Sequence, residues 1–232
     1  MKKNCAIKPG GPPGLVGVIA SPEALICAGR LRRLPDFFEL RLDALFDSLG
    51  KIEEHLPRLR APLILTARDP AEGGCNHLPL AARRALLERF LERAAFVDLE
   101  LAVVRQMRPM LDRLRKRQIG LILSVHRLHH PPPRGELDRL VRSAAIFRPD
   151  IFKLVLRAEN AADLERLVNF LTGQPRAHFP IAAMGAGRFG LRSRLLLAQL
   201  GSALTYASVG EPLLEGQPSL NQLRRVRKAF LN

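Results

Sequence analysis

Eight short apolar runs, separated by longer amphipathic stretches, are the feature of this sequence that most restricts its fold. Each run is bounded by proline, glycine or polar residues, as is typical of parallel strands that are covered on both faces. The runs are Leu15–Ala20, Phe37–Arg41, Pro62–Ala67, Phe96–Glu100, Gly120–Ser124, Ile151–Leu156, Phe179–Met184 and Ala203–Ser208. Eight strands alternating with helices predict an α/β protein, a (β/α)8 TIM barrel. An open doubly wound sheet is the alternative, because alternation does not determine whether the sheet closes.

The stretches between the runs have helical periodicity, with apolar residues three or four positions apart and charges elsewhere. The clearest are Leu80–Arg93, Leu101–Arg117, Ala161–Leu171 and Ser219–Phe230. The chain has 232 residues and no interior linker or repeat, and a barrel of this kind takes about 250 residues. We therefore expect an N-terminal lead-in over residues 1–14 and one catalytic barrel domain over residues 15–232.

Bulk properties limit the compartment and the class of protein. Hydrophobic residues make up 47% of the chain, which is enough for a large core, and no apolar run is long enough for a transmembrane helix. A stretch of proline and glycine, Pro9 to Gly14, lies where a signal peptide would be apolar, so we expect a cytoplasmic protein. The three cysteines, Cys5, Cys27 and Cys75, form no CxxC pair and are interpreted as reduced thiols.

The chain is strongly basic, with 37 Lys and Arg against 22 Asp and Glu and a net charge of +15. Such a surface attracts anions and could bind nucleic acid without specificity. Aromatic residues are only 5% of the chain, and no base-stacking motif or zinc knuckle is present. We therefore favour a solvated basic surface that suits a small anionic substrate, with no specific nucleic-acid partner and no membrane.

In a barrel, active residues lie at the carboxyl ends of the strands, which directs attention to Lys153 and His126. Burial of Lys153 in the barrel mouth would favour the neutral amine, a nucleophile toward ketones, but a lysine on an edge strand fits the pattern equally well. His126 could shuttle protons or could be a hydrogen-bonded strand-end residue. His129 and His130 precede Pro131–Pro133, but no fourth ligand is indicated, so we predict no metal site.

Charged residues also recur at alternate positions of apolar strands. Glu39 and Arg41 share one strand face, with Asp43 just beyond, and Asp98 and Glu100 end another strand in the same way. Buried charges need partners or a polar ligand, so an internal ion-pair network is the structural alternative to a binding site. Two polar loops add candidates, one with Arg68 and Glu72 before two glycines, the other Gly185–Arg194, which could bind a phosphate or carboxylate.

Taken in order, these pieces resemble the type I 3-dehydroquinate dehydratase family over about residues 15–231. The matching motifs are Glu39-x-Arg41-x-Asp43, Arg68 with Glu72-Gly73-Gly74, Asp98-x-Glu100, Ser124-x-His126, Lys153, Ser193-Arg194-Leu195, Gly201-Ser202 and Gly216-Gln217. Each motif is weak alone, but their joint order and spacing are specific.

The resemblance implies conversion of 3-dehydroquinate to 3-dehydroshikimate and water, by syn elimination through a lysine imine, in the shikimate pathway of aromatic amino acid biosynthesis. The resemblance implies three catalytic residues: Lys153 forms the imine, His126 moves protons, and Glu72 orients His126. It implies that the substrate carboxylate is held by Arg194 and Gln217. The ring hydroxyls would be held by Glu39, Arg41 and Arg68. It also implies no metal or organic cofactor, and a homodimer. Arginines near Lys153 would disfavour its protonation.

The chain departs from the family pattern at three positions. Ala186 stands where a methionine is usual, although Met184 could fill that place. Leu213 stands where a small polar residue is frequent, and Arg127 stands where an acidic residue or asparagine is usual. Two alternatives follow. One is another lysine-imine barrel enzyme, such as an aldolase, which would not need His126 paired with Glu72. The other is a catalytically lost basic binding protein.

Overall fold

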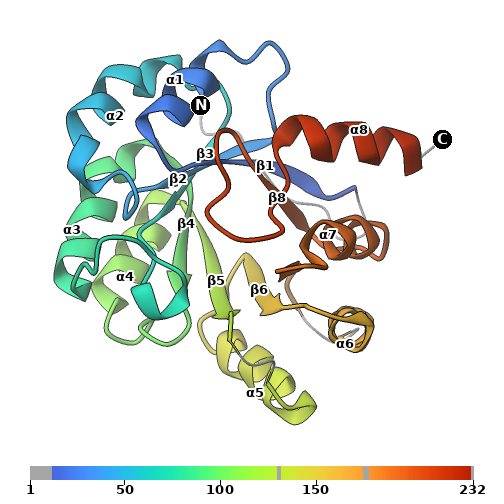
Figure 1. The fold of residues 1–232 in the computed structure, drawn as a ribbon. Coiled ribbons are helices and arrows are strands. Elements are labelled where there is room, and N and C mark those ends of the chain that lie inside the picture. Colours follow the sequence, from blue (N-terminus) through green and yellow to red (C-terminus); the bar gives the residue numbers. More distant parts are fainter. Residues whose placement is uncertain (1–11, 130–131, 175–177, 231–232) are drawn as a thin grey trace.

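In the computed structural model, which describes residues 12–129, 132–174 and 178–230, eight parallel strands alternate with eight α-helices (Figure 1). The strands are β1 (Gly14–Ile19), β2 (Phe37–Arg41), β3 (Leu63–Thr66), β4 (Ala94–Glu100), β5 (Gly120–Arg127), β6 (Ile151–Arg157), β7 (Ile181–Ala186) and β8 (Leu204–Ser208). Each predicted run overlaps one strand. Residues 1–11, with Cys5 and most of the expected lead-in, and His130 and Pro131 lie outside the described residues.

The sheet closes into a barrel, so the open doubly wound alternative is wrong. Parallel ladders join the strands in the order β7-β6-β5-β4-β3-β2-β1-β8. The remaining gap between β7 and β8 is bridged by the Ala203 amide, which donates to the Ile181 carbonyl at 2.8 Å. Beside it, the Ser202 hydroxyl oxygen accepts from the Ala183 amide at 3.0 Å. Short polar contacts at the base thus hold β7 and β8 together.

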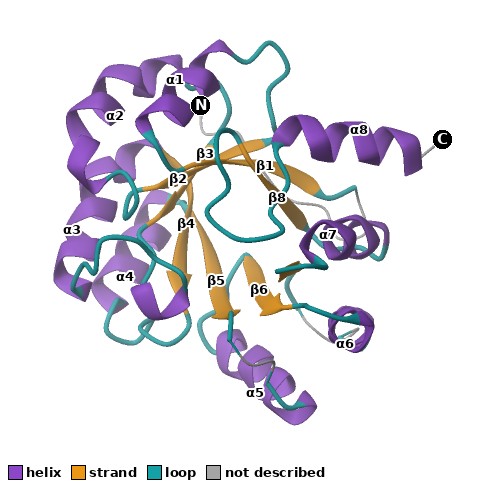
Figure 2. Ribbon diagram, viewed as in Figure 1, coloured by secondary structure: helices purple, strands orange, loops and turns teal. Residues whose placement is uncertain are grey.

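The helices form an outer layer around the strands (Figure 2). They are α1 (Pro22–Arg30), α2 (Leu49–His55), α3 (Leu80–Phe90), α4 (Arg108–Arg117), α5 (Arg134–Ala145), α6 (Ala161–Thr172), α7 (Gly190–Gln199) and α8 (Leu220–Phe230). Side chains cap several of them: the Ser21 hydroxyl accepts from the Ala24 amide at 3.2 Å at the start of α1. The predicted helix Leu101–Arg117 begins only at Arg108, because residues 101–107 form turns over the barrel rim.

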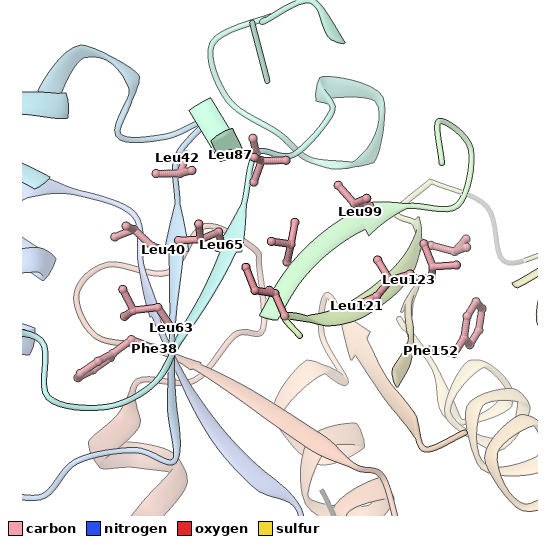
Figure 3. Packing of buried hydrophobic residues seen from close by; sticks show 14 of the residues in the cluster. Phe38, Leu40, Leu42, Leu63, Leu65, Leu87, Leu99, Leu121, Leu123 and Phe152 are labelled. Atoms are coloured by element: carbon pink, nitrogen blue, oxygen red, sulfur yellow. The ribbon is translucent and has the colours of Figure 1, made fainter. Parts of the chain in front are cut away.

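Strand alternation divides the apolar residues into two cores. Outward residues such as Leu40, Leu65 and Leu123 pack against the helices (Figure 3). Inward residues such as Phe37, Ile64 and Ile122 fill the lower barrel. Because successive side chains point to opposite faces, the polar residues of the same strands also point inward, above this apolar plug.

The loop between β8 and α8, residues 209–219, crosses the barrel mouth in the view that Figures 1 and 2 share. The carboxyl ends of all strands therefore face a space that this loop covers. Within the described residues, no helix combines the length and the apolar character that crossing a membrane requires.

Candidate active site

One small cavity at the barrel mouth is lined by all eight site residues that the sequence predicted. They are Glu39, Arg41, Arg68, Glu72, His126, Lys153, Arg194 and Gln217. The cavity has a volume of about 30 Å³, whereas a benzene-sized ligand needs about 150 Å³. A ring-shaped ligand can therefore enter only if the loop over the mouth moves.

Lys153 lies in the interior of the barrel. It is 4% exposed, and β6 is paired with β5 and β7 on its two sides, so the edge-strand alternative is wrong. Its Nζ lies 3.0 Å from Asp98 Oδ2 and 3.3 Å from Glu39 Oε1. The same nitrogen lies over the ring of Tyr206, 4.1 Å from the ring centre. The amine is thus fixed at the floor of the cavity.

The charges nearest to Lys153 differ from those that the sequence suggested. Arginines were expected to disfavour its protonation, but Asp98 and Glu39 are the groups in direct contact with the nitrogen. The nitrogen is therefore held by two carboxylates. A reaction in which this amine attacks a ketone needs a group that accepts a proton from it, and these carboxylates are in contact with it.

Asp98 is the centre of a buried polar network. Its carboxylate accepts from the Ser124 hydroxyl at 2.6 Å and pairs with Arg68 at 2.9 Å, in addition to Lys153. Burial alone would raise the pKa of Asp98, but the charges of Arg68 and Lys153 outweigh it and hold the pKa at about 2. This carboxylate is ionised at neutral pH and keeps Arg68 and Lys153 close together.

Glu72, which follows β3, and His126 of β5 form a second buried pair. Glu72 ends a 3₁₀ turn that Asp69 caps, and Gly73 follows with φ +83°, in the left-handed region that favours glycine. One oxygen, Glu72 Oε2, accepts from the His126 amide at 2.9 Å and lies 3.1 Å from His126 Nδ1. The turn thus aims the carboxylate at the histidine ring.

The electrostatics of this pair favour a neutral imidazole. Burial, reinforced by Arg68 and Lys153, holds the pKa of His126 well below its ordinary value. Burial raises the pKa of Glu72 to about 7, although Arg68 opposes the shift. With Glu72 ionised, we assign the Nδ1 proton to the bond with Glu72, which leaves the Nε2 lone pair of His126 free to act as a base.

Arg194 is a buried cation without an acidic partner among the described residues. It is 2% exposed, and its guanidinium donates to backbone carbonyls at Tyr206 (3.0 Å), Gly185 (2.6 Å) and Gly190 (2.9 Å). Burial lowers its pKa to about 10, so it is still charged at neutral pH. A charged guanidinium that carbonyl dipoles alone hold in place is suited to bind an anion such as a carboxylate.

Arg41 and Glu39 stand on the opposite side, anchored by neighbours. Arg41 binds Asp43 through two hydrogen bonds of 2.9 and 2.7 Å, so its charge is already paired. Glu39 Oε1 accepts from the Thr66 hydroxyl at 2.9 Å. Fixed donors and acceptors of this kind can bind hydroxyl groups of a ligand.

The β8–α8 loop supplies the roof of the cavity. Gln217 Oε1 accepts from the Leu213 amide at 3.2 Å, and Leu213 and Leu214 line the cavity. The loop is held down by the Gly187 amide, which donates to the Glu215 carbonyl at 2.8 Å, and by an ion pair of 2.8 Å between Glu215 and Arg157. The structure therefore describes a closed mouth with an apolar roof.

Of the three departures from the family pattern, one faces the site. Leu213 lines the cavity, and so does Met184, whereas Ala186 belongs to the inward-facing apolar cluster without lining the cavity. Arg127 pairs with Glu136 at 3.5 Å on the surface, where both side chains are partly exposed. Met184 is thus a methionine that lines this cavity, and the apolar roof at Leu213 is the departure that a ligand would meet.

Sequence reasoning missed two polar side chains of the site, Thr66 and Tyr206. Tyr206 lines the cavity beneath Lys153, and Thr66 supports Glu39. Both alternate with outward residues on their strands, as Glu39 and Arg41 do. That alternation was the available signal, but a tyrosine or threonine within an apolar run is also the ordinary composition of a strand.

Two larger hollows lie outside the barrel mouth. One of about 230 Å³ lies between α5 and α6, and one of about 300 Å³ lies beside α5 and shares Glu72 with the barrel cavity. Neither is lined by a lysine, a histidine or a cysteine, so neither could form an imine. Among the residues described, no group of three or more His, Cys, Asp or Glu could hold a metal ion.

Comparisons with known proteins point to one family. A family model described as type I 3-dehydroquinase matches residues 20–230. The chain is 30% identical over 215 residues to a 3-dehydroquinate dehydratase of Thermococcus onnurineus, covering 91% of this chain and 95% of that protein. It is 32% identical to one of Dehalococcoides mccartyi over 83% and 85% of the two chains. The crystal structure of the 3-dehydroquinate dehydratase from Geobacillus kaustophilus is similar in fold, with a TM-score of 0.85 and 23% identity over 96% and 93% of the chains.

Proposed function

Because the chain belongs to the type I 3-dehydroquinase family, we propose that it works through an imine at Lys153. Its activity is that of a 3-dehydroquinate dehydratase, a hydro-lyase. The net reaction removes water from 3-dehydroquinate and gives 3-dehydroshikimate, a step of the shikimate pathway. The observation that carries the proposal is that a buried lysine, a histidine–glutamate pair and an unpaired arginine line one cavity.

Imine formation begins with the loss of a proton from Lys153 Nζ. Asp98 is a poor acceptor because its pKa is about 2, whereas Glu39 Oε1 lies 3.3 Å away and is within reach of the proton. The nitrogen lone pair then attacks the ketone carbon. The resulting carbinolamine takes back the proton that Glu39 holds and loses water, which leaves a protonated imine.

The protonated imine acts as an electron sink for the next step. His126 Nε2 takes a proton from the carbon next to the imine, and the electron pair of that bond forms a carbon–carbon double bond as the nitrogen becomes neutral. Because the Glu72 carboxylate accepts a hydrogen bond from His126 Nδ1–H, the positive charge that develops on His126 is stabilised.

Elimination reverses this electron flow. The enamine electrons expel the hydroxyl on the next carbon, and the protonated His126 donates its proton to that hydroxyl, so water departs. Since one imidazole serves both steps, proton and hydroxyl leave from the same face, a syn elimination. Water then hydrolyses the imine, which restores the Lys153 amine and releases the conjugated enone.

The remaining residues hold the substrate in this orientation. We propose that Arg194 binds the carboxylate, with the Gln217 amide group approaching from the loop, since the Gln217 oxygen is already occupied by Leu213. Glu39, Arg41 and Arg68 would bind the ring hydroxyls. In this scheme every proton and electron pair is handled by protein and substrate, so no metal or organic cofactor takes part.

Compartment and assembly complete the proposal. We propose a cytoplasmic enzyme, which the sparse cysteines favour, and a homodimer. Analytical ultracentrifugation at micromolar concentration would measure the mass in solution, and a mass of 25.8 kDa, that of one chain, would contradict the dimer.

Turnover is tested by mixing the protein with 3-dehydroquinate and following the absorbance of the conjugated enone. We expect turnover in the native chain and in Lys116→Met, which changes an exposed lysine of α4, but none in Lys153→Met. An aldolase would instead cleave a carbon–carbon bond without forming the enone. No enone formation by the native chain would contradict the proposed function.

A further inference from the structure

Tyr206 occupies the floor of the cavity and is not accounted for by the mechanism above. It lies in β8, is 3% exposed and belongs to the inward-facing cluster of the barrel. Its ring supports Lys153 Nζ, 4.1 Å from the ring centre, and its backbone carbonyl accepts from Arg194 Nε at 3.0 Å. One residue is thus in contact with both ends of the site, the nucleophile and the anion-binding guanidinium.

The hydroxyl of Tyr206 is buried and has no hydrogen-bond partner among the described residues. A buried hydroxyl without a partner is destabilising, so its presence at a binding cavity points to a ligand atom that completes the bond. The residue also lines the cavity, so a ligand that enters the cavity lies against this side chain.

Thr205, the preceding residue, provides an internal comparison. Its hydroxyl is also buried and without a partner, but strand alternation directs Thr205 to the outer face of β8. The neighbouring outward residue, Ala207, packs with Leu220 and Leu223 of α8. Thr205 does not line the cavity, so the two adjacent hydroxyls share burial and differ in their access to a ligand.

The surroundings of the phenol fix its hydrogen-bonding character. Burial holds the pKa of Tyr206 well above its ordinary value, and the negative charges of Glu39 and Asp98 add to the shift. The group therefore keeps its proton at neutral pH and can donate it to an oxygen. Those same carboxylates contact Lys153, so the phenol is near the position at which the substrate ketone must lie.

We propose that the Tyr206 hydroxyl is a further substrate contact, donating to an oxygen on or next to the ketone carbon that Lys153 attacks. This inference rests on the proposed function and extends it. During imine formation the ketone oxygen becomes the hydroxyl of the carbinolamine, and a donor beside the nitrogen would orient this oxygen while Lys153 bonds to the carbon. The ring beneath Nζ fixes the direction from which the nitrogen approaches.

The test compares Tyr206→Phe, which removes only the hydroxyl and keeps the ring, with Thr205→Val. We expect Tyr206→Phe to lower kcat/KM about tenfold, the effect of one neutral hydrogen bond at the reacting centre, while its urea midpoint is unchanged or higher. Thr205→Val should keep native kinetics. Loss of activity without loss of stability is a result that a purely structural role would not produce.

Two outcomes would overturn the inference. One is a Tyr206→Phe enzyme with kcat and KM within twofold of native, and the other is a variant that loses activity and stability together. Both are distinct from failure of the proposed function, in which the native chain itself forms no enone from 3-dehydroquinate. Turnover by the native chain with an unaffected Tyr206→Phe would remove only the role of the hydroxyl.

Discussion

Replacing Glu72 by glutamine should make the protein more stable and less active. Glu72 Oε2 is the acceptor for the amide and the ring of His126, and its side chain is almost fully buried. Glutamine keeps the size and an acceptor oxygen but removes the charge. The variant therefore separates the destabilising effect of an ionised buried carboxylate from its contribution to proton transfer.

The magnitude follows from the pKa. Burial raises the pKa of Glu72 from 4.5 to about 7, and each pKa unit corresponds to about 1.4 kcal/mol. Between pH 4.5 and about 7 the unfolded chain is ionised at this residue while the folded protein keeps the proton. Folding stability therefore falls as the pH rises through this window, by about 3 kcal/mol in all, and stays constant above it.

Glutamine lacks this titration, so the stability of Glu72→Gln relative to native should increase by about 3 kcal/mol between pH 4.5 and pH 8. The native protein and Glu72→Gln must be compared at each pH because His126 also titrates. Its pKa is lowered in the folded protein, so its contribution to stability rises with pH in both proteins and cancels in the difference. On the kinetic side, loss of a charge-assisted bond worth about 1.5–3 kcal/mol should lower kcat about tenfold to a hundredfold.

The assay is urea unfolding at pH 5 and pH 8, with kcat measured at pH 8. Glu165→Gln, the same change at an exposed residue of α6, is the matched control and should leave stability and kcat unchanged. The reasoning is refuted if the native protein and Glu72→Gln lose or gain stability in parallel between the two pH values. The account also expects kcat of the native protein to decrease as the pH is lowered below about 7, because Glu72 then takes up a proton. A kcat that stays constant in this range would contradict it.

Three further changes have definite expected outcomes. Arg194→Gln should raise KM about a hundredfold, since about 3 kcal/mol of carboxylate binding is lost, without lowering the free energy of unfolding. Asp98→Asn should lose about 2 kcal/mol of stability at pH 7, from the shift of its pKa from 3.8 to about 2, and this difference should shrink as the pH falls from about 4 toward 2. Gly216→Ala should lower kcat/KM, because Gly216 has φ +75° and an added Cβ would collide with the Gly187 carbonyl. Steady-state kinetics and urea titrations measure the effects of all three substitutions.

These predictions can each fail in a recognisable way. A native KM in Arg194→Gln would mean that another group binds the carboxylate. A stability difference for Asp98→Asn that persists at pH 2 would mean that the effect is packing and not charge. For the loop, Gly50→Ala in α2, where an added Cβ meets no atom within 4 Å, should keep native kinetics, and an equal loss in both glycine variants would contradict the argument from strain.

Much of the fold follows from local pattern. Glu39 and Arg41 face inward because they stand at alternate positions of a strand whose other positions, such as Leu40, pack against helices. This period of two is interrupted at the start of β4, where Ala95 is an extra residue between Ala94 and Phe96 in the ladder with β3. Elsewhere in β4 it again places Asp98 and Glu100 on one face, so the sequence indicates which charges share the barrel interior.

Element boundaries depend on tertiary contacts that the pattern does not contain. The predicted strand Phe179–Met184 is β7, Ile181–Ala186, because Pro180 has no amide hydrogen and joins the sheet only through its carbonyl, which accepts from the Phe152 amide at 3.0 Å. Likewise Val104 and Met107 are buried beneath the rim in turns, although their spacing is that of a helix.

The partners within the site depend on barrel closure. Lys153 and Glu39 are 114 positions apart in the chain, and His126 and Glu72 are 54 apart, so local reasoning could list these groups but could not say that they touch. It also suggested arginines as the neighbours of Lys153, whereas carboxylates and the Tyr206 ring surround its nitrogen. The alternation along each strand predicts which residues belong to the site. The charge interactions among them depend on interatomic distances, which only the structure gives.

The central claim, a covalent imine at Lys153, is tested most directly by borohydride reduction in the presence of 3-dehydroquinate followed by peptide mass spectrometry. The account predicts a reduced adduct on the peptide that contains Lys153, inactivation only when substrate and borohydride are both present, and no adduct in Lys153→Met. Turnover that borohydride leaves intact, or an adduct on a different lysine, would contradict it.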